Sequence, residues 1–230
     1  MKSRSFCILF LFFTILLTSS FTRNQNSLNT FSDEINFPLL NLENKKVEDK
    51  IYKCLIDSIN NHFFSDDVVP AKNRTEIIER FKSEKEVNYT VSYEISSLKN
   101  TISIVLNYNW DYWNGNGWDS DYYVFDLRNG NILNLVETMK NPIKFDSILN
   151  SRIYKYKIDY INEMKSDEYD EITLEELKWC FKNKSFQFKN DSLFVYPDCE
   201  FPRVNQALEP FEPIKIAKKE LKAILKKEYQ

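Results

Sequence analysis

The sequence has few of the residues on which phosphate-binding loops and histidine-based catalysis depend. Its 230 residues include three glycines and one histidine, His62. So few glycines exclude a glycine-rich phosphate-binding loop, and a Ser-His-Asp or Cys-His site would have to use a histidine at the end of an amphipathic helix. No Cys-x-x-Cys pair occurs, which excludes zinc ribbons and thioredoxin-like redox motifs. We therefore expect a protein that is not an enzyme and that binds no cofactor and no metal.

Long apolar runs are also scarce, and the one that occurs lies at the N-terminus. Lys2 and Arg4 precede an apolar stretch from Phe6 to Leu17, which the small polar residues 18–20 follow. This order is typical of a cleavable secretory signal peptide. As a helix the stretch would reach about 18 Å, well short of the roughly 30 Å hydrocarbon core of a bilayer. We predict that residues 1–20 are removed, that the mature chain has no transmembrane segment, and that it is secreted or periplasmic.

Removing the signal peptide leaves three cysteines, an odd number in a compartment that permits disulfides. We predict a bridge between Cys180 and Cys199, because the segments that hold them can lie side by side around a hairpin, and a free thiol at Cys54. The alternative is three unpaired cysteines that act as small hydrophobic residues.

The net charge limits the class of partner. The formal charge of −3 falls to −5 once Lys2 and Arg4 are removed. This mild acidity argues against a nucleic-acid partner and is compatible with a cationic protein.

Hydrophobic periodicity predicts an α+β fold, with an antiparallel β-sheet built from hairpins and helices packed against it. After a linker at 21–36, we expect a single domain over 37–230, with two possible sub-lobes at 37–98 and 99–230. A first helix is predicted from an apolar face formed by Val47, Ile51, Cys54, Leu55, Ile59 and Phe63. A second helix at 74–84, a hairpin of strands 87–95 and 102–108, and a second hairpin around Asn129-Gly130 with strands 123–127 and 132–135 follow.

The second half of the chain shows the same kinds of signals. Pro142 opens a helix with Phe145, Ile148, Leu149, Tyr156 and Tyr160 as core positions. Thr173 and Glu176 form a predicted capping box for a short helix. A hairpin turning at Asn190-Asp191, a strand at 214–216 and a closing helix with Leu221, Ile224 and Leu225 complete the prediction.

Several of these segments together resemble a known family. Tyr122-Tyr-Val-Phe-Asp-Leu-Arg-Asn-Gly-Asn-Ile-Leu-Asn-Leu135 resembles the aromatic–x–Phe-Asp-Leu–x–x–Gly–x–x–Leu–x–Leu signature of the RsiV C-terminal domain family. Ser185-Phe-Gln-Phe188, Asp191 to Tyr196, and Pro213 to Leu221 are similar to the closing strands of that family. Segments from Phe37 to Tyr108 resemble its usual N-terminal companion half. The resemblance implies an extracytoplasmic sensing or binding domain, of the type that binds lysozyme in anti-sigma factors and accompanies PdaC-type peptidoglycan deacetylases.

A loop predicted over 109–122 carries the candidate binding site. Aromatic faces flanked by carboxylates and amides can stack on sugar rings or hold an Arg or Lys side chain. The candidate residues are Trp110, Tyr112, Trp113, Trp118, Asp119, Asp121 and Tyr122. The alternatives are that the aromatic rings fold back onto the sheet, or that Asn114, Asn116, Asp119 and Asp121 bind calcium.

We expect an exported, non-enzymatic binding domain that recognises a cell-wall glycan or a cationic, lysozyme-like protein. Two alternatives remain open. One is a hydrolase or esterase that uses paired carboxylates on envelope polymers. The acidic pairs Asp66-Asp67, Asp167-Glu168 and Glu175-Glu176 are expected to be solvated turns and helix starts and give this alternative no specific support. The other is a purely structural envelope protein.

Overall fold

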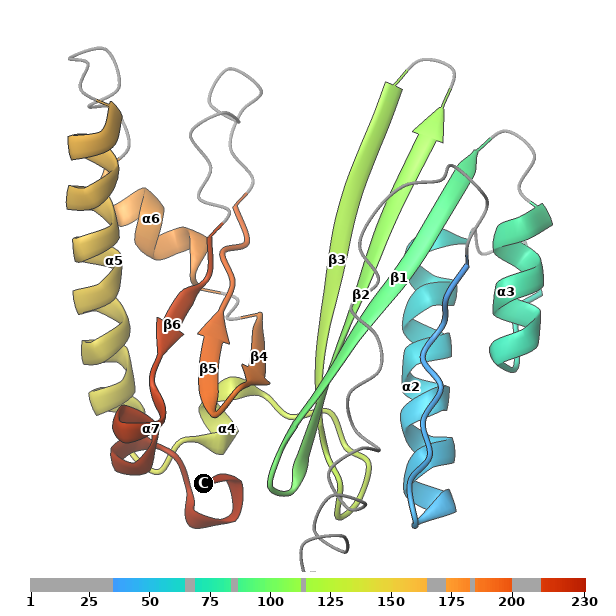
Figure 1. Cartoon of the computed structure of the whole chain (residues 1–230), viewed down its shortest axis with the longest axis horizontal. Coiled ribbons are helices and arrows are strands. Elements are labelled where there is room, and N and C mark those ends of the chain that lie inside the picture. Colours follow the sequence, from blue (N-terminus) through green and yellow to red (C-terminus); the bar gives the residue numbers. More distant parts are fainter. Residues whose placement is uncertain are drawn as a thin grey trace, which may run out of the picture. The chain divides into compact units, whose positions relative to one another are not determined.

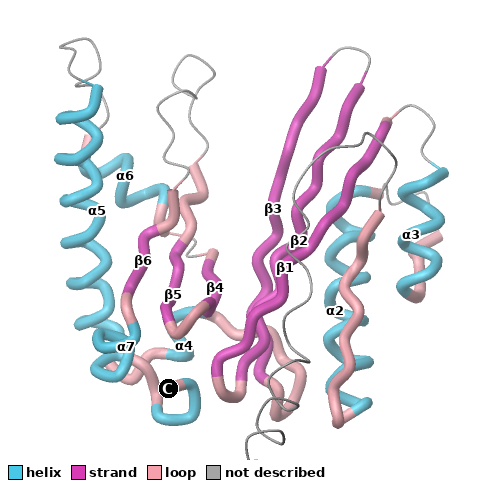
Figure 2. Tube along the Cα trace, viewed as in Figure 1, coloured by secondary structure: helices cyan, strands magenta, loops and turns pink. Residues whose placement is uncertain are grey.

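The computed structural model describes residues 35–64, 69–83, 87–112, 115–164, 173–182, 185–199 and 212–230, with the backbone alone for Tyr112 and 160–164. These residues belong to one compact unit, Asp33–Gln230. They form two three-stranded antiparallel sheets with helices packed beside them (Figure 1; Figure 2). The predicted α+β class is therefore confirmed.

The first sheet consists of β1 (Asn88–Leu98), β2 (Thr101–Tyr112) and β3 (Gly115–Asp126), in that order. The predicted hairpin of β1 and β2 is confirmed, and it turns at Lys99, whose φ is +51°. The predicted wide loop over 109–122 is wrong, because β2 and β3 stay paired out to Tyr112 and Gly115. Polar residues occupy both faces of the sheet near this end, and they hide the two-residue period of the strands.

Two helices, α2 (Lys45–Phe63) and α3 (Arg74–Ser83), contribute the first core with one face of this sheet (Figure 1). Asn44 caps the start of α2, where its side chain accepts the Val47 N–H. The predicted apolar face of α2 is confirmed, with Ile51 and Leu55 fully buried. Buried Asn60 joins α2 to the segment that leads into α3, since its carboxamide both donates to and accepts from the backbone of Ala71, at 2.9 and 3.0 Å.

The chain reverses after β3 in a tight turn. Asp126 O accepts the N–H of Gly130 at 2.7 Å, and Gly130 has a φ of +70°, a conformation that favours glycine. The strand expected at 132–135 is reduced to one bridge and a hydrogen bond from Leu133 N–H to Val124 O, at 2.7 Å. The reason is that Asn134 and Glu137 form a capping box that starts α4 (Leu135–Thr138).

The second sheet consists of β4 (Phe186–Lys189), β5 (Ser192–Val195) and β6 (Ile214–Ile216). The predicted turn at Asn190-Asp191 is confirmed, with both residues at positive φ. The helices α5 (Pro142–Met164), α6 (Leu174–Cys180) and α7 (Lys218–Ile224) and the 3-10 helix η3 (Lys227–Tyr229) belong to this half of the chain.

Residues from these helices and strands form the second core. Of the positions predicted for α5, Phe145 and Leu149 are buried and Ile148 and Tyr156 are partly buried, whereas the side chain of Tyr160 lies outside the described residues. The predicted capping box of Thr173 and Glu176 is present at the start of α6.

Strand β4 connects the two sheets. The N–H of Phe188 donates to the Oγ of buried Ser103 at 3.0 Å, and the Oγ of Ser96 donates to the Phe188 carbonyl. Val124 belongs to the second core and the next residue, Phe125, to the first, because successive side chains of a strand point to opposite faces. Strand β3 therefore contributes to both cores.

The predicted signal peptide at 1–20 lies outside the described residues. Ile35 and Asn36, at the end of the predicted linker, already join the fold, since Asn36 N–H donates to Val91 O at 2.8 Å. Within the part of the chain that the structure describes, none of the helices is long and apolar enough to span a membrane.

Candidate functional site

The predicted site residues lie on two opposite faces of the β1–β3 sheet. Trp110, Asp119 and Asp121 point toward α2, because they share the alternation of buried Tyr108 and Tyr123. Trp118 and Tyr122 point to the opposite face. Tyr112 is described by its backbone alone, and Trp113 lies outside the described residues. The structure therefore does not bring the seven residues into one site.

On the side facing α2, Asp121 accepts hydrogen bonds from two tyrosines. Its Oδ2 lies 2.9 Å from the hydroxyl of Tyr123 and 3.4 Å from that of Tyr108, and Tyr123 also contacts Ser58 Oγ of α2 at 2.9 Å. Burial, together with the Asp121 carboxylate, raises the pKa of both tyrosines, so both hydroxyls remain protonated and able to donate. Asp121 thus helps to hold α2 on the sheet.

Asp119 is also occupied by contacts within the chain. Its Oδ1 accepts the backbone N–H of Ser120 at 2.7 Å, and its Oδ2 lies 3.4 Å from Nε2 of His62 in the last turn of α2. Both side chains are about half exposed, with fractions of 45% and 46%. The contact connects the end of α2 to β3.

Trp110 packs on its own sheet. Its cross-strand partner is Gly117, and a Cβ at that position would come within 2.5 Å of the indole ring. Any side chain at this position would force the indole ring to move, because the ring covers the backbone of Gly117. For Trp110 the structure therefore agrees with the alternative that aromatic rings fold back onto the sheet.

The opposite face of the same hairpin has a different character, and we call it the open face. It consists of Thr90 and Ser92 of β1, Asn107 and Asn109 of β2, and Trp118, Ser120 and Tyr122 of β3. The side chain of Trp118 is 73% exposed and lies opposite Asn109. The Ser120 hydroxyl donates to Asn107 Oδ1 at 2.9 Å. That bond orients the carboxamide of Asn107 so that its NH₂ group is the part directed away from Ser120.

A tyrosine from the second sheet extends the open face. Tyr196, just after β5, stacks on Tyr122 with ring centroids 4.1 Å apart and an angle of 29° between the planes. The Tyr196 hydroxyl donates to Oε1 of buried Gln187 at 3.0 Å, and Gln187 in turn lies 3.4 Å from Ser96 Oγ. Burial raises the pKa of Tyr196 to about 12 and also raises that of Tyr122, so both rings are neutral near pH 7.

Tyr196 is absent from the site predicted from the sequence. The sequence pattern of 193–196 predicts a strand that ends near Tyr196. The contact of Tyr196 with Tyr122, however, depends on how the two sheets pack. Composition and spacing carry no signal for that contact.

Among the residues that the structure describes, neither the acidic pair expected at a helix start nor the residues considered for calcium form a site. Glu176 is the capping residue of α6, and its hydrogen bond from the Thr173 N–H lowers its pKa. Asn116 and Asp119 lie on opposite faces of β3. Across the described ranges, no three His, Cys, Asp or Glu side chains are placed to hold a metal. Asn114, Asp66-Asp67 and Asp167-Glu168 lie outside these ranges.

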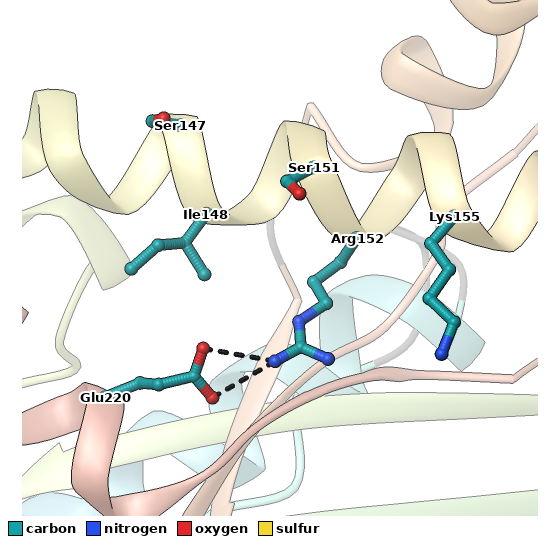
Figure 3. A pocket seen from close by; sticks show the side chains of 6 residues that line it. All are labelled: Ser147, Ile148, Ser151, Arg152, Lys155 and Glu220. Atoms are coloured by element: carbon teal, nitrogen blue, oxygen red, sulfur yellow. Dashed lines mark hydrogen bonds and ion pairs between the residues drawn. The ribbon is translucent and has the colours of Figure 1, made fainter.

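Two shallow hollows lie elsewhere. One, of about 380 Å³, lies between α5 and α7, where Nη2 of Arg152 contacts both carboxylate oxygens of Glu220 at 3.1 and 3.2 Å (Figure 3). The other, of about 570 Å³, lies beside Asp126, Arg128 and Tyr229. In the first hollow Arg152 is paired with Glu220 across the two helices, and in the second Arg128 is paired with Asp126 and with Glu228 of η3.

Cys180 and Cys199 form a disulfide in the structure. Their Cα atoms are 4.5 Å apart, and the bond joins the end of α6 to the segment after β5. Cys54 is a free, partly buried thiol.

Comparisons with known proteins found a similarity among solved structures but none among protein families or curated proteins. No protein-family model and no curated protein matches the sequence. Among solved structures, the chain is similar to the crystal structure of a DUF3298 family protein from Pseudomonas aeruginosa. The two are 11% identical, the match covers 77% of this chain and 78% of the other, and the TM-score is 0.49.

Proposed function

We propose that the protein is an exported, non-enzymatic binding domain that recognises a cell-wall glycan through the open face. The observation that carries the proposal is Trp118, which is 73% exposed on a face that carries mainly hydroxyls, amides and a tyrosine, with the carboxylates of Asp111 and Glu94 toward its ends. An exposed indole offers a flat apolar surface for the C–H face of a sugar ring, while neighbouring amides and hydroxyls bond to the sugar hydroxyls.

The charges on the two faces favour a glycan over a cationic protein. Asp119 and Asp121, the carboxylates predicted to attract a cation, lie on the α2 side and have partners there. On the open face, Glu94 forms an ion pair with Lys189, and Asp111 adds a carboxylate at the far end of β2. Apart from the Asp111 carboxylate, the side chains around Trp118 are neutral donors and acceptors, which suit uncharged hydroxyl and acetamido groups.

The sequence of residues 1–20 supports the proposed export, and the turn after β3 supports the resemblance to the RsiV C-terminal domain family. Residues 1–20 have the order of a signal peptide. The signature shared with the RsiV C-terminal domain family spans the turn after β3. There Asp126 accepts the backbone N–H of Arg128 and Gly130 supplies a positive φ. The shared residues therefore have a structural reason to occur together. Sequencing the N-terminus of the protein from the envelope fraction tests export, and we expect a start near Phe21.

The binding proposal is tested by co-sedimentation with insoluble peptidoglycan. We expect the native protein to sediment and Trp118→Ala to bind at least about tenfold more weakly, because an exposed aromatic anchor dominates such a contact. The melting temperature should stay nearly unchanged, since the side chain is largely exposed. Trp179→Ala on α6, where the indole is 46% exposed, is the control and should bind normally.

Two outcomes would contradict the proposal. One is the absence of sedimentation of the native protein, and the other is equal binding by Trp118→Ala. Capture of lysozyme that survives Trp118→Ala and weakens with added salt would instead favour the cationic-protein alternative, because screening weakens contacts between charges.

A further inference from the structure

The open face has two separate aromatic positions. Trp118 and Tyr122 lie on one face of β3, four residues apart, which corresponds to about 13 Å along an extended strand. A single sugar ring is shorter than this separation. A monosaccharide can therefore contact one position only, whereas a chain of linked sugars can contact both.

The second position is a rigid pair. Tyr122 and Tyr196 stack at 4.1 Å, and the hydroxyl of Tyr196 is held by buried Gln187. Gln187 belongs to β4, so the pair is positioned by both sheets. Because the rings are already packed and bonded, little side-chain entropy remains to be lost when a ligand binds.

Polar side chains lie between the two aromatic positions. Ser120 is midway between Trp118 and Tyr122 on β3, and its hydroxyl bonds to Asn107 Oδ1 across the strand. The NH₂ group of Asn107 is thereby left as the oriented donor, which suits a carbonyl or ring oxygen of the ligand. Asn109, opposite Trp118, adds an exposed carboxamide.

We propose that the open face binds a linear oligosaccharide of several linked sugars along β3, from Trp118 to the Tyr122–Tyr196 pair, with an acetamido or ring oxygen over Asn107. This inference rests on the proposed function and adds to it the length and direction of the ligand. Tyr196 is then a binding residue that the second sheet contributes.

Chitin oligosaccharides of increasing length, from the mono- to the hexasaccharide, test the inference by isothermal titration calorimetry. We expect the affinity to rise steeply, by at least tenfold, up to the length that spans both positions and then to level off. In Trp118→Ala the dependence on length should disappear. Tyr196→Ala should weaken the binding of the longer sugars toward that of the shorter ones, while Tyr196→Phe, which keeps the ring, should retain most of the affinity.

Tyr154→Ala on α5, whose ring is 55% exposed, is the matched control and should leave the whole series unchanged. If Tyr196→Ala does not fold, the affinities of the native protein for sugars of increasing length still test the extended site. Equal affinity for the mono- and hexasaccharide, with binding still lost in Trp118→Ala, would overturn the extended site and leave glycan binding standing. Lack of binding at every length, together with failure to sediment with peptidoglycan, would instead contradict the proposed function itself.

Discussion

Aspartates of one strand have different roles according to what surrounds each carboxylate. Asp126, at the end of β3, is 2% exposed and accepts from the backbone and Nε of Arg128, both at 2.9 Å, and from the Tyr229 hydroxyl at 3.2 Å. The hydrogen bonds from the Arg128 side chain are the main reason that its pKa is lowered. Asp119 on the same strand is half exposed and contacts one backbone N–H and His62.

Asp126→Asn should remove a pH-dependent part of the stability. Because folding lowers the pKa of Asp126, its stabilising effect is complete above the ordinary aspartate value of about 3.9 and is lost as the pH falls through the lower, folded value. We expect the variant to melt at a lower temperature than the native protein at pH 7, and the difference to shrink below about pH 4.

Melting curves between pH 7 and pH 2.5 measure this effect. Asp159→Asn, at an exposed position of α5, is the control and should follow the native curve. If the melting temperatures of Asp126→Asn and the native protein differed by the same amount at every pH, the charge of the carboxylate would not be the source of the stabilisation.

At the level of elements, the sequence predicted most helices and hairpins but not the extent of the β2–β3 hairpin. The apolar face of α2, the capping box of Thr173 and Glu176, and the turn at Asn190-Asp191 are local signals, and each is present. Near the end of β2 and the start of β3, aromatic, acidic and amide side chains occur on both faces, so the sequence pattern predicts a loop. A loop would place all the aromatic and acidic residues in one site, whereas the two-residue period of the strands separates them.

The disulfide between α6 and the segment after β5 closes a loop with a sequence separation of 19 residues. Loop closure of this length predicts that Cys199→Ala lowers the free energy of unfolding by about 3 kcal/mol. Urea unfolding of the oxidised protein measures the loss. Cys199 is the better position for this test because Cys180 is fully buried and its replacement would also leave a cavity.

Non-reducing peptide mapping checks the pairing directly and should show a Cys180–Cys199 peptide and an unmodified Cys54. Cys54→Ala, which removes the free thiol, serves as the control and should keep its sensitivity to reductant. If reductant lowers the stability of Cys199→Ala as much as that of the native protein, the stabilising bond involves Cys54 and the pairing is wrong.

For the whole molecule, the important feature is that the two cores share strand β3 and that buried hydrogen bonds join β4 to the first sheet. We call this contact between β4 and the first sheet the seam. Val124 and Phe125 point into different cores, and Ser103 of β2 accepts the N–H of Phe188 from β4. The contact between Tyr122 and Tyr196 exists because this seam fixes one sheet on the other. Such pairings between distant parts of the chain follow from tertiary packing, which is why periodicity could not predict Tyr196.

Ser103→Ala should destabilise the molecule by about 1–3 kcal/mol, because it leaves a buried backbone N–H without an acceptor. Urea unfolding followed by tryptophan fluorescence and by circular dichroism should give one coincident transition for the native protein. Ser97→Ala, at an exposed position of β1, should have little effect. Two separate transitions in the native protein would mean that the cores unfold independently and that the seam contributes little.

The outer edge of β3 has a consequence for how these molecules behave at high concentration. Leu133 pairs with Val124, but in the described structure β3 is an edge strand and no further strand continues along Gly115–Tyr122. Open edges of this kind are where separate chains add strands to one another and aggregate. Here the Asp119 carboxylate already accepts the N–H of Ser120. In an antiparallel pairing of two copies around Ser120, each Asp119 would face an Asp121 of the other copy, and the two like charges would repel. The two carboxylates therefore protect the exposed hairpin from growing into a shared sheet.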